Sequence, residues 1–570
     1  MTAADPQTPL LLTHVTVIDV AGGPSRPDYT VAIAGGRITA MGPAAKIPAP
    51  PAAQVLDATG KFLIPGLWDM HVHWHDKDYL QLYIANGVTG VRVMAGSPSQ
   101  LEWRKELESG QLQGPHLVLG SPIVDGPKPF WRQISVKNEA EARAAVIKLK
   151  QSGWDFVKVY QFLTRDAYFA IADEAKKQGI PFAGHVPLSV SPEEASRAGQ
   201  KSFEHLIGIL PACSTRRAEL TAAAQADLAE DLAGWPKFWG PHLRELRQAT
   251  LDSYSAAKAA ALFSELKSNG TWQCPTLTLL HMFGFGDDPA FLKDARLKYM
   301  PRQIRAGWNP AAVDGKRTPE DFAFMKKEFQ KDLEVVGAMQ KAGVGILAGT
   351  DTMNPFCFPG FSLHDELGFL VQAGLSPMQA LQAATLNPAR FFGNEKNLGT
   401  VEPGKVADLV LLDANPLDDI GNTRRIAAVV SGGKLLTRAA LDEMLTGIEA
   451  IANRKSIGEA LAKTIRENGV DAAVKQYREL RATQPAAYDF GEDEFIDLGY
   501  RLIAMKKFKD AIEIFKLSVE AYPQSYNTYD SLAEAYMDDG DKELAIQNYQ
   551  KSLEINPRNV NAVEKLKTLK

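Results

Sequence analysis

The sequence predicts an α/β protein: a (β/α)8 (TIM) barrel, a small β-sandwich formed by both flanks of the barrel segment, and a C-terminal α-helical repeat domain. Short apolar runs alternate with helical stretches in the middle of the chain, glycine-broken β-branched runs lie on both sides of them, and the tail repeats itself. The expected boundaries are 8–64 with 396–440 for the sandwich, 65–395 for the barrel and 455–570 for the repeats.

Length, charge and cysteine content narrow the class of protein. A chain of 570 residues exceeds one ordinary hydrophobic core, so a large domain with smaller companions is expected. The net charge of −5 provides no strong positive field, which disfavours nucleic acid or an anionic membrane as a partner. The three cysteines are far apart and odd in number, which predicts buried thiols and neither a disulfide framework nor a thiolate zinc site.

The sequence also gives expectations about the cellular location of the protein. No apolar run approaches the roughly 18 residues of a membrane-spanning helix. The start MTAADPQTPL lacks the basic and apolar regions of a signal peptide. The chain as written is therefore expected to be soluble and cytoplasmic, whereas a signal peptide removed earlier would make it periplasmic or secreted.

The flanking strands are marked by glycine pairs. Residues 10–20 and 30–41 are β-branched runs broken by glycines at 22–23 and 35–36, which predicts antiparallel strands. A similar pattern returns at residues 407–413 and 427–436, far along the chain. These two strand groups are expected to meet in one small sheet domain around the intervening barrel.

Apolar runs between these flanks predict parallel strands with chemistry at their C-terminal ends. The expected strands cover residues 87–94, 117–119, 156–159, 182–185, 202–205, 271–280 and 344–348, and the helices between them include 139–152 and 165–179. Residues 207–270 and 300–319 are long for connections, so they are candidate lid or pocket-wall insertions.

The tail has the period of a tetratricopeptide helical pair. Its signature is a small alanine at a helix contact, an aromatic residue in the groove, and a proline that ends the second helix. Ala511, Phe515 and Pro523 recur 34 residues later as Ala545, Tyr549 and Pro557, and Ala473, Tyr477 and Pro485 precede the first set by 38 residues. Two or three such units are expected to mediate dimerisation, dock on the barrel or bind a peptide.

The strongest local signal is the segment 66–73, which contains His71 and His73 directly after the β-like residues 62–64. On a strand, residues two apart face the same side, so both imidazoles can reach one metal ion. His75 continues the alternation beyond the expected strand end, where a supporting or surface position is expected.

Four more chemistry-bearing residues follow at successive strand ends. Lys158 lies in an apolar strand, where an unpaired ammonium would be costly; a salt bridge with Asp155 or a stem reaching to solvent is the alternative explanation. His185 and His205 end the next two expected strands, and Asp351 follows another. Taken singly, the histidines could be hydrogen-bonded core residues and the aspartate a helix cap.

As an ordered set, these residues resemble the metal ligands of the amidohydrolase superfamily. The chain is most similar to the binuclear branch that contains prolidase-like dipeptidases, lysine or arginine carboxypeptidases and ochratoxin-type hydrolases. The resemblance covers residues 10–437 and includes the segment 398–410, where such enzymes return to their small β-sandwich.

The resemblance implies two divalent metal ions and a carboxylated lysine. In that family the lysine at the position of Lys158 reacts with carbon dioxide to give a carbamate, which bridges the metals. Nitrogen and oxygen ligands without thiolate favour zinc, with manganese or cobalt as alternatives. The implied ligands are His71, His73 and Asp351 for one metal, His185 and His205 for the other, and Lys158 for both.

Such a site predicts hydrolysis of the amide bond of a dipeptide or N-acyl amino acid by metal-activated hydroxide, with Asp351 and Lys158 as catalytic residues. Tyr160 faces the same side of its strand as Lys158 and is a candidate substrate contact, although packing below the metals is equally compatible. His364 and Glu366 are expected to support the metal ligands, ahead of helix capping or substrate binding.

Some positions depart from the peptidase pattern and leave the substrate open. His116 stands where related enzymes commonly have arginine, residues 125–128 lack their glycine-histidine loop, and Val93 replaces an acidic residue. The alternative enzyme is a hydrolase of a cyclic amide, lactone or carbamate, similar to imidazolonepropionase, which typically uses one metal without the lysine. A non-enzymatic scaffold is the remote alternative, and the repeats leave a homo-oligomer or a peptide partner open.

Overall fold

The computed structural model describes residues 8–73, 76–129, 133–223, 241–308, 317–557 and 559–569. The chain divides into two compact units, Met1–Ile448 and Glu449–Lys570, and each is described by itself. His75 lies outside the described residues, as do parts of both expected insertions.

One eight-stranded sheet joins the two flanks of the first unit, as the glycine-broken runs predicted. Its order is β17-β16-β15-β5-β1-β2-β3, with β4 paired to β1. Antiparallel pairing of β15 with β5 joins the N-terminal strands to the C-terminal ones. The strands are β1 (Leu10–Val17), β2 (Arg26–Ala34), β3 (Arg37–Pro43), β4 (Gln54–Asp57), β5 (Phe62–Pro65), β15 (Leu409–Leu412), β16 (Ile426–Ser431) and β17 (Lys434–Thr437).

Parallel strands form the centre of the first unit. One sheet has the order β6-β7-β8 and a second the order β10-β9-β11-β12-β13-β14. The strands are β6 (Leu67–Val72), β7 (Val88–Val93), β8 (His116–Leu119), β9 (Val124–Asp125), β10 (Ile134–Ser135), β11 (Val157–Val159), β12 (Phe182–Gly184), β13 (Ser202–Glu204) and β14 (Trp272–Cys274). Five predicted strands therefore occur within two residues of their expected bounds. Four of them, β7, β11, β12 and β13, are buried along their whole length, as is usual for strands of a parallel sheet that is covered on both faces.

Residues 344–352 were expected to include a strand and instead run as an extended segment with isolated bridges. Ile346 bridges Gln273 in parallel, and Thr352 bridges Val72 in parallel. A third parallel bridge joins Gly120 to Phe156, just beyond β8 and just before β11. The first two bridges connect β14 to β6 through the segment 344–352, and the third connects the two parallel sheets directly.

The expected strand at residues 271–280 is too long. β14 ends at Cys274, and the helix α10 (Leu277–Phe285) begins three residues later. Pro275 has no backbone N–H for a strand ladder, and Thr276 has φ 49°, so the chain turns out of the strand at this point.

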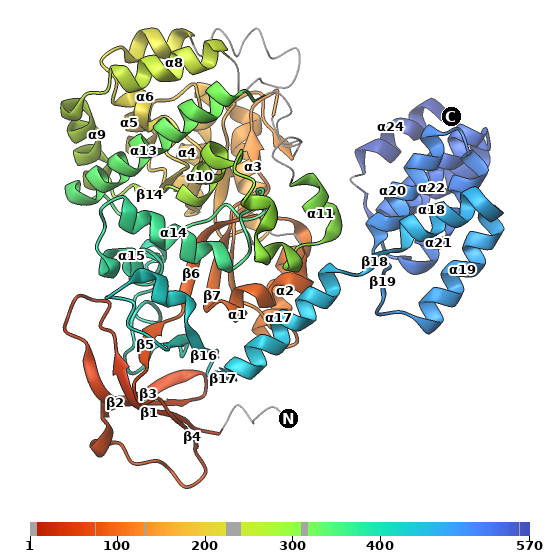
Figure 1. Ribbon diagram of the computed structural model, residues 1–570. Helices are drawn as coiled ribbons and strands as arrows, with labels where there is room; N and C mark the ends of the chain where they lie inside the picture. The colour runs from red at the N-terminus through yellow and green to blue at the C-terminus, as the bar shows by residue number, and fades with distance from the viewer. Residues whose placement is uncertain are drawn as a thin grey trace. The chain divides into compact units, whose positions relative to one another are not determined.

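Helices surround the parallel strands, and the eight-stranded sheet lies at the end of the unit opposite α8 and α9 (Figure 1). The helices are α1 (Gln81–Ala85), α2 (Pro98–Glu108), α3 (Glu139–Gln151), α4 (Arg165–Gln178), α5 (Pro192–Arg197), α6 (Ile209–Ala212), α8 (Pro241–Asp252), α9 (Ala256–Ser268), α10, α11 (Arg302–Gly307), α13 (Pro319–Ala342), α14 (Phe361–Gln372), α15 (Pro377–Ala383) and α16 (Leu386–Phe392). The helix α17 (Arg438–Ala452) spans the boundary between the two units. Short 3-10 helices include η5 (Ile420–Arg424). Among the described helices, none has both the length and the apolar character needed to cross a bilayer.

The second unit consists of helices that pack on their neighbours in sequence, together with the short parallel pair β18 (Lys455–Ser456) and β19 (Tyr488–Asp489). The repeated alanine and aromatic positions Ala511, Phe515, Ala545 and Tyr549 are fully buried, which agrees with the predicted repeat. The helices are α18 (Ile457–Asn468), α19 (Val470–Thr483), α20 (Glu492–Ala504), α21 (Phe508–Ala521), α22 (Tyr526–Asp539), α23 (Lys542–Ile555) and α24 (Val560–Leu569).

Candidate metal centre

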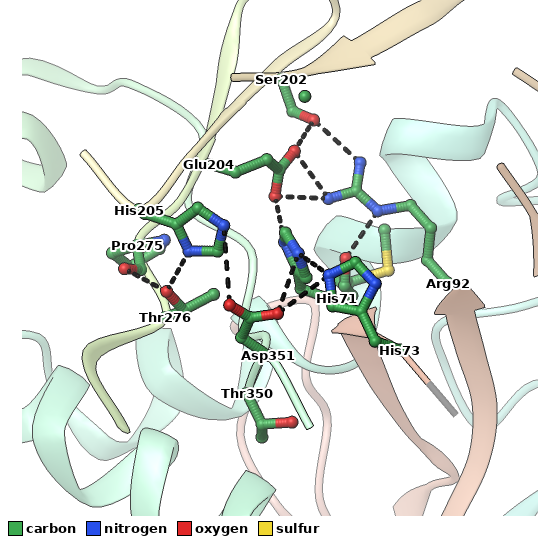
Figure 2. A network of polar contacts seen from close by, with 12 residues as sticks. His71, His73, Arg92, Ser202, Glu204, His205, Pro275, Thr276, Thr350 and Asp351 are labelled. Carbon is green, nitrogen blue, oxygen red and sulfur yellow. Dashed lines mark hydrogen bonds and ion pairs between the residues drawn. The ribbon is translucent and has the colours of Figure 1, made fainter. Parts of the chain in front are cut away.

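Two histidines and one carboxylate meet at the end of β6. His71 Nε2 lies 3.1 Å from His73 Nε2, and Asp351 Oδ1 lies 3.3 Å from the former and 3.0 Å from the latter (Figure 2). Asp351 Oδ1 is buried and has no hydrogen bond of good geometry within the described part of the chain. Three donor atoms thus converge from β6 and from the segment that follows Ile346.

His205 approaches the same carboxylate from the end of β13. Its Nε2 lies 3.7 Å from Asp351 Oδ2, and its ring centroid lies 4.5 Å from that of His71. His71, His205 and Asp351 place one ligand atom each within 4.8 Å of one another, which is close enough to hold a metal ion. The structure therefore supports a metal site made of two residues predicted for the first metal, His71 and Asp351, and one predicted for the second, His205.

Lys158 and His185 lie beside this cluster. Lys158, on β11, is fully buried, and its Nζ has no hydrogen-bond partner among the described residues. His185 follows β12; its Nδ1 also lacks a partner there, and its ring centroid lies 5.0 Å from that of His205. The structure thus brings all six predicted ligands to one region.

The alternative explanations for Lys158 do not hold. Asp155 accepts hydrogen bonds from Arg104 Nη1 at 2.8 Å and from the backbone N–H of Leu119 at 2.7 Å, so it serves other partners. A side chain with no exposed surface does not extend to solvent. The buried amine therefore requires another explanation.

Tyr160 lies next to both residues. Its ring stacks on that of His185, with centroids 4.0 Å apart, and Lys158 Nζ lies 5.8 Å from the ring centroid. Tyr160 is partly exposed, in contrast to Lys158. Its position suits a residue that lines the site.

Two glycines allow the strands to bring these ligands together. A Cβ at Gly184 would lie 2.2 Å from the carbonyl oxygen of Val159, and its φ of 136° disfavours any other residue, so His185 can follow β12 close to β11. A Cβ at Gly349 would lie 2.5 Å from Cys274 Sγ and 2.9 Å from His71 Cβ. The segment that carries Asp351 can therefore approach β6.

The surroundings of His71, His185, His205 and Asp351 favour the protonation states that bind metal. Burial and nearby positive charges hold the pKa of His71 and His185 well below its usual value, and burial lowers the pKa of His205 to about 4. Burial would raise the pKa of Asp351, but the interactions with His205, His73 and Lys158 outweigh it and lower this pKa. Neutral imidazoles and an ionised carboxylate are the forms that ligate metals.

The donor set fits a divalent cation. Atoms bound tetrahedrally at the usual zinc distances lie about 3.3 Å from one another. The separations of 3.0–3.3 Å among His71, His73 and Asp351 agree with this value. Cys274 also lies near His71, but burial raises the pKa of its thiol well above the usual value, so it stays a neutral thiol.

Several neighbours of the ligands were not predicted. Glu204 accepts a hydrogen bond from His71 Nδ1 at 2.8 Å and pairs with Arg92, while Thr276 contacts His205 (Figure 2). The signal that identified Lys158, a charged residue in a short buried strand, also marks Arg92 in β7 and Glu204 in β13. Thr276 carries no comparable signal, since threonine is common next to strand ends.

The predicted supporting residues lie on α14. His364 Nδ1 lies 2.9 Å from Thr423 Oγ1, and its Nε2 lies 3.1 Å from the carbonyl oxygen of Asn86. Glu366 accepts hydrogen bonds from the backbone N–H groups of Leu277 and Thr278 at 3.0 and 2.8 Å. His364 thus connects α14 to η5 and to the end of α1, whereas Glu366 holds the start of α10 beside Thr276.

Comparison with known proteins reveals family matches in both units. Residues 299–436 match the Amidohydrolase family, and residues 526–559 match the Tetratricopeptide repeat. Over 443 residues the chain is 23% identical to a protein named ochratoxinase from Aspergillus niger, covering 65% of this chain and 75% of that protein.

Solved structures share the fold. Bottromycin amidohydrolase matches with a TM-score of 0.61 and 24% identity over 78% of this chain and 90% of that one. A Xaa-Pro dipeptidase with methionine bound in its active site matches with a TM-score of 0.54 and 20% identity over 75% of this chain and all of that one (100%). The predicted resemblance and the predicted C-terminal repeat are both confirmed.

Proposed function

This chain belongs to the amidohydrolase superfamily and carries a C-terminal tetratricopeptide repeat, and we propose that it is a binuclear metal-dependent hydrolase of an amide bond. The substrate class that we propose is a dipeptide or an N-acyl amino acid. The names of the relatives support this class, since they include an ochratoxinase, an amidohydrolase and a dipeptidase.

The strand pairings support a (β/α)8 barrel as the scaffold. The bridge from Gly120 to Phe156 joins the sheet β6-β7-β8 to the sheet that contains β11 to β14. The bridges of Ile346 and Thr352 continue from β14 back to β6, which would close a ring of eight. We propose 65–395 as this barrel, 8–64 with 396–440 as the sandwich, and 455–570 as the repeat domain.

The observation that carries the proposal is the buried, unpartnered amine of Lys158. An ammonium without a partner in the interior is strongly disfavoured. Burial lowers the pKa of Lys158 to about 8, which increases the fraction of neutral amine near neutral pH. A neutral amine can attack carbon dioxide through its lone pair and release one proton, so that a carbamate anion replaces the cation.

A carboxylated Lys158 would complete two sets of ligands. His71, His73 and Asp351 would hold one cation, and His185 and His205 the other, with Lys158 between them. When bound, such cations supply Lewis acidity for the scissile carbonyl and lower the pKa of a water molecule. Zinc suits this nitrogen and oxygen set best.

Asp351 would move the proton. Its Oδ1 faces His71 and His73, whereas Oδ2 faces His205 at 3.7 Å. In the proposed reaction this carboxylate accepts the proton of the attacking water and returns it to the leaving amine. Tyr160, partly exposed beside His185, would contact the substrate or its developing oxyanion.

The one-metal alternative, a hydrolase of a cyclic amide, lactone or carbamate, assigns no role to Lys158. As a direct test, zinc-loaded protein is incubated with a library of dipeptides, N-acyl amino acids, cyclic amides and lactones, and hydrolysis of each compound is measured. We expect turnover of linear amides that is lost in His71→Ala. The proposal would be contradicted if the protein hydrolysed only cyclic substrates and bound one metal ion per chain.

A further inference from the structure

The geometry points to Thr276 and Glu204 as positioning residues that hold His205 and His71 in the tautomer whose Nε2 is free to bind metal. Neither residue is a predicted metal ligand; each acts through a histidine. The inference rests on the proposed metal-dependent function and specifies how the protein prepares that site.

Thr276 fixes the tautomer of His205. A threonine hydroxyl has a single proton, and here Oγ1 donates it to the carbonyl oxygen of Pro275 at 2.8 Å (Figure 2). The same Oγ1 lies 2.7 Å from His205 Nδ1, so it accepts a hydrogen bond from this nitrogen. His205 therefore carries its proton on Nδ1 and turns the lone pair of Nε2 toward Asp351.

The backbone at Thr276 is specialised for this contact. Thr276 is fully buried with φ 49° and ψ 52°, a left-handed conformation that β-branched residues rarely adopt. Glu366 fixes the next two residues by accepting hydrogen bonds from their backbone N–H groups. This conformation is unfavourable for threonine, and the hydrogen bonds of the following turn hold it in place. The position of the Thr276 hydroxyl is therefore expected to be functionally important.

Glu204 fixes the tautomer of His71. Both carboxylate oxygens accept from Arg92 Nη2 at 3.0 Å, and Oε1 also accepts from Ser202 Oγ at 2.5 Å. Arg92 is always charged and fully buried here, so it pairs with an ionised carboxylate. An ionised carboxylate only accepts hydrogen bonds, and Oε2 lies 2.8 Å from His71 Nδ1, so the proton resides on Nδ1.

Arg92 is itself fixed. Its Nε donates to the carbonyl oxygen of Met70 at 2.6 Å, and its Nη1 donates to Ser202 Oγ at 2.8 Å. The guanidinium also lies 5.0 Å from the ring centroid of Phe391. Glu204 is therefore held by a partner that is itself fixed, and the His71 imidazole cannot turn without breaking this network.

Thr276 is tested by a pair of substitutions in the full chain. Thr276→Val removes the hydroxyl but keeps the β-branched shape and its backbone preference, whereas Thr276→Ser keeps the hydroxyl. We expect the affinity for Zn²⁺, measured by competition with a chromophoric chelator, to fall about 10- to 100-fold in Thr276→Val. Thr276→Ser should bind with the affinity of the unchanged protein.

Glu204 is tested by Glu204→Gln. Arg92 will attract the amide oxygen, which turns the amide NH2 toward His71 Nδ1 and forces its proton to Nε2, a tautomer that cannot bind metal there. We expect weaker Zn²⁺ binding and an altered absorption spectrum of bound Co²⁺. Asp321→Asn is the matched control, because Asp321 is also a buried carboxylate paired with an arginine, Arg244, on elements away from the cluster.

The outcomes separate this inference from the proposed function. Equal loss of affinity in Thr276→Val and Thr276→Ser, or equal loss in Glu204→Gln and Asp321→Asn, would assign a merely structural role and overturn the inference. Full affinity in Thr276→Val would overturn it as well, while the proposed function would stand. If the unchanged protein binds no metal, the proposed function itself fails.

Discussion

Asp351 Oδ1 lies 3.0 Å from His73 Nε2, although the two residues come from the last and the first parallel segments of the first unit. The backbone holds this approach, since Asp351 N–H donates to the carbonyl oxygen of His71 at 2.8 Å and His73 N–H to that of Thr352 at 2.7 Å. These backbone hydrogen bonds thus determine where the Asp351 carboxylate lies relative to His71 and His73.

The first prediction concerns this carboxylate. Asp351→Asn removes a charged ligand and the proposed proton carrier, so we expect turnover of the best amide substrate to fall by about 10²- to 10⁴-fold or more. Elemental analysis should also show reduced metal content. Asp155→Asn, which changes a carboxylate paired with Arg104, is the control and should keep its metal. Equal metal content and turnover in Asp351→Asn would contradict the assignment.

The second prediction concerns chemical rescue at Lys158. Lys158→Ala should lose most activity, and short-chain carboxylates such as acetate or propionate should restore part of it by supplying the missing anion. Lys158→Arg should remain inactive with or without them, because a guanidinium keeps its charge and its volume. Steady-state rates with and without added carboxylate provide the measurement. Unchanged activity in the alanine variant would exclude a bridging role.

The third prediction concerns pH and the contact between His116 Nε2 and Asp408 Oδ2, 2.8 Å apart. The hydrogen bond to Asp408 raises the pKa of His116 above its usual 6.5. The contribution of this contact to the stability of the folded protein is therefore complete below pH 6.5, and it is lost as the pH rises through the raised pKa of His116. Because the His116 side chain is half-exposed, we expect this contact to contribute less than about 1 kcal/mol to the free energy of unfolding.

Urea unfolding of the unchanged protein and of His116→Gln at pH 5.5 and pH 9 measures this effect. The difference in unfolding free energy should be larger at the lower pH. A difference that is independent of pH would show that the charge of His116 does not contribute.

The fourth prediction concerns the helical repeats. Phe515 is fully buried in the second unit, so Phe515→Ala should destabilise that unit by about 3–5 kcal/mol. Since the predicted ligands all belong to the first unit, we expect zinc affinity to stay unchanged. Thermal unfolding and a zinc titration of the same sample give both quantities. Loss of zinc binding would mean that the metal centre depends on the repeats.

Much of this site follows from the sequence because its ligands share one regularity. Each of Lys158, His185 and His205 lies on or directly after a short apolar run, and such runs become buried strands. The flanking sheet was predictable for a similar reason, since glycine pairs divide its β-branched runs into hairpins. The repeat of Ala511 and Phe515 as Ala545 and Tyr549 likewise reflects packing that depends on local spacing.

Other features depend on contacts that local patterns do not encode. The role of Thr276 requires Pro275 to end β14 and Glu366, from a distant helix, to hold the following turn. Residues 344–348 have a strand-like composition, yet among them only Ile346 forms an isolated bridge. The chain then passes close to His71 at Gly349, and Asp351 is left-handed with φ 56°. The partners of His364 belong to α1 and η5, which no spacing near α14 indicates.

The central claim is a carboxylated Lys158 between two metal ions, and a high-resolution crystal structure of active, zinc-loaded protein tests it most directly. The claim predicts electron density for three atoms beyond Lys158 Nζ, with anomalous peaks on both sides, one near His71 and His73 and the other near His185 and His205. An unmodified Lys158 beside a single anomalous peak, in protein with full activity, would contradict it.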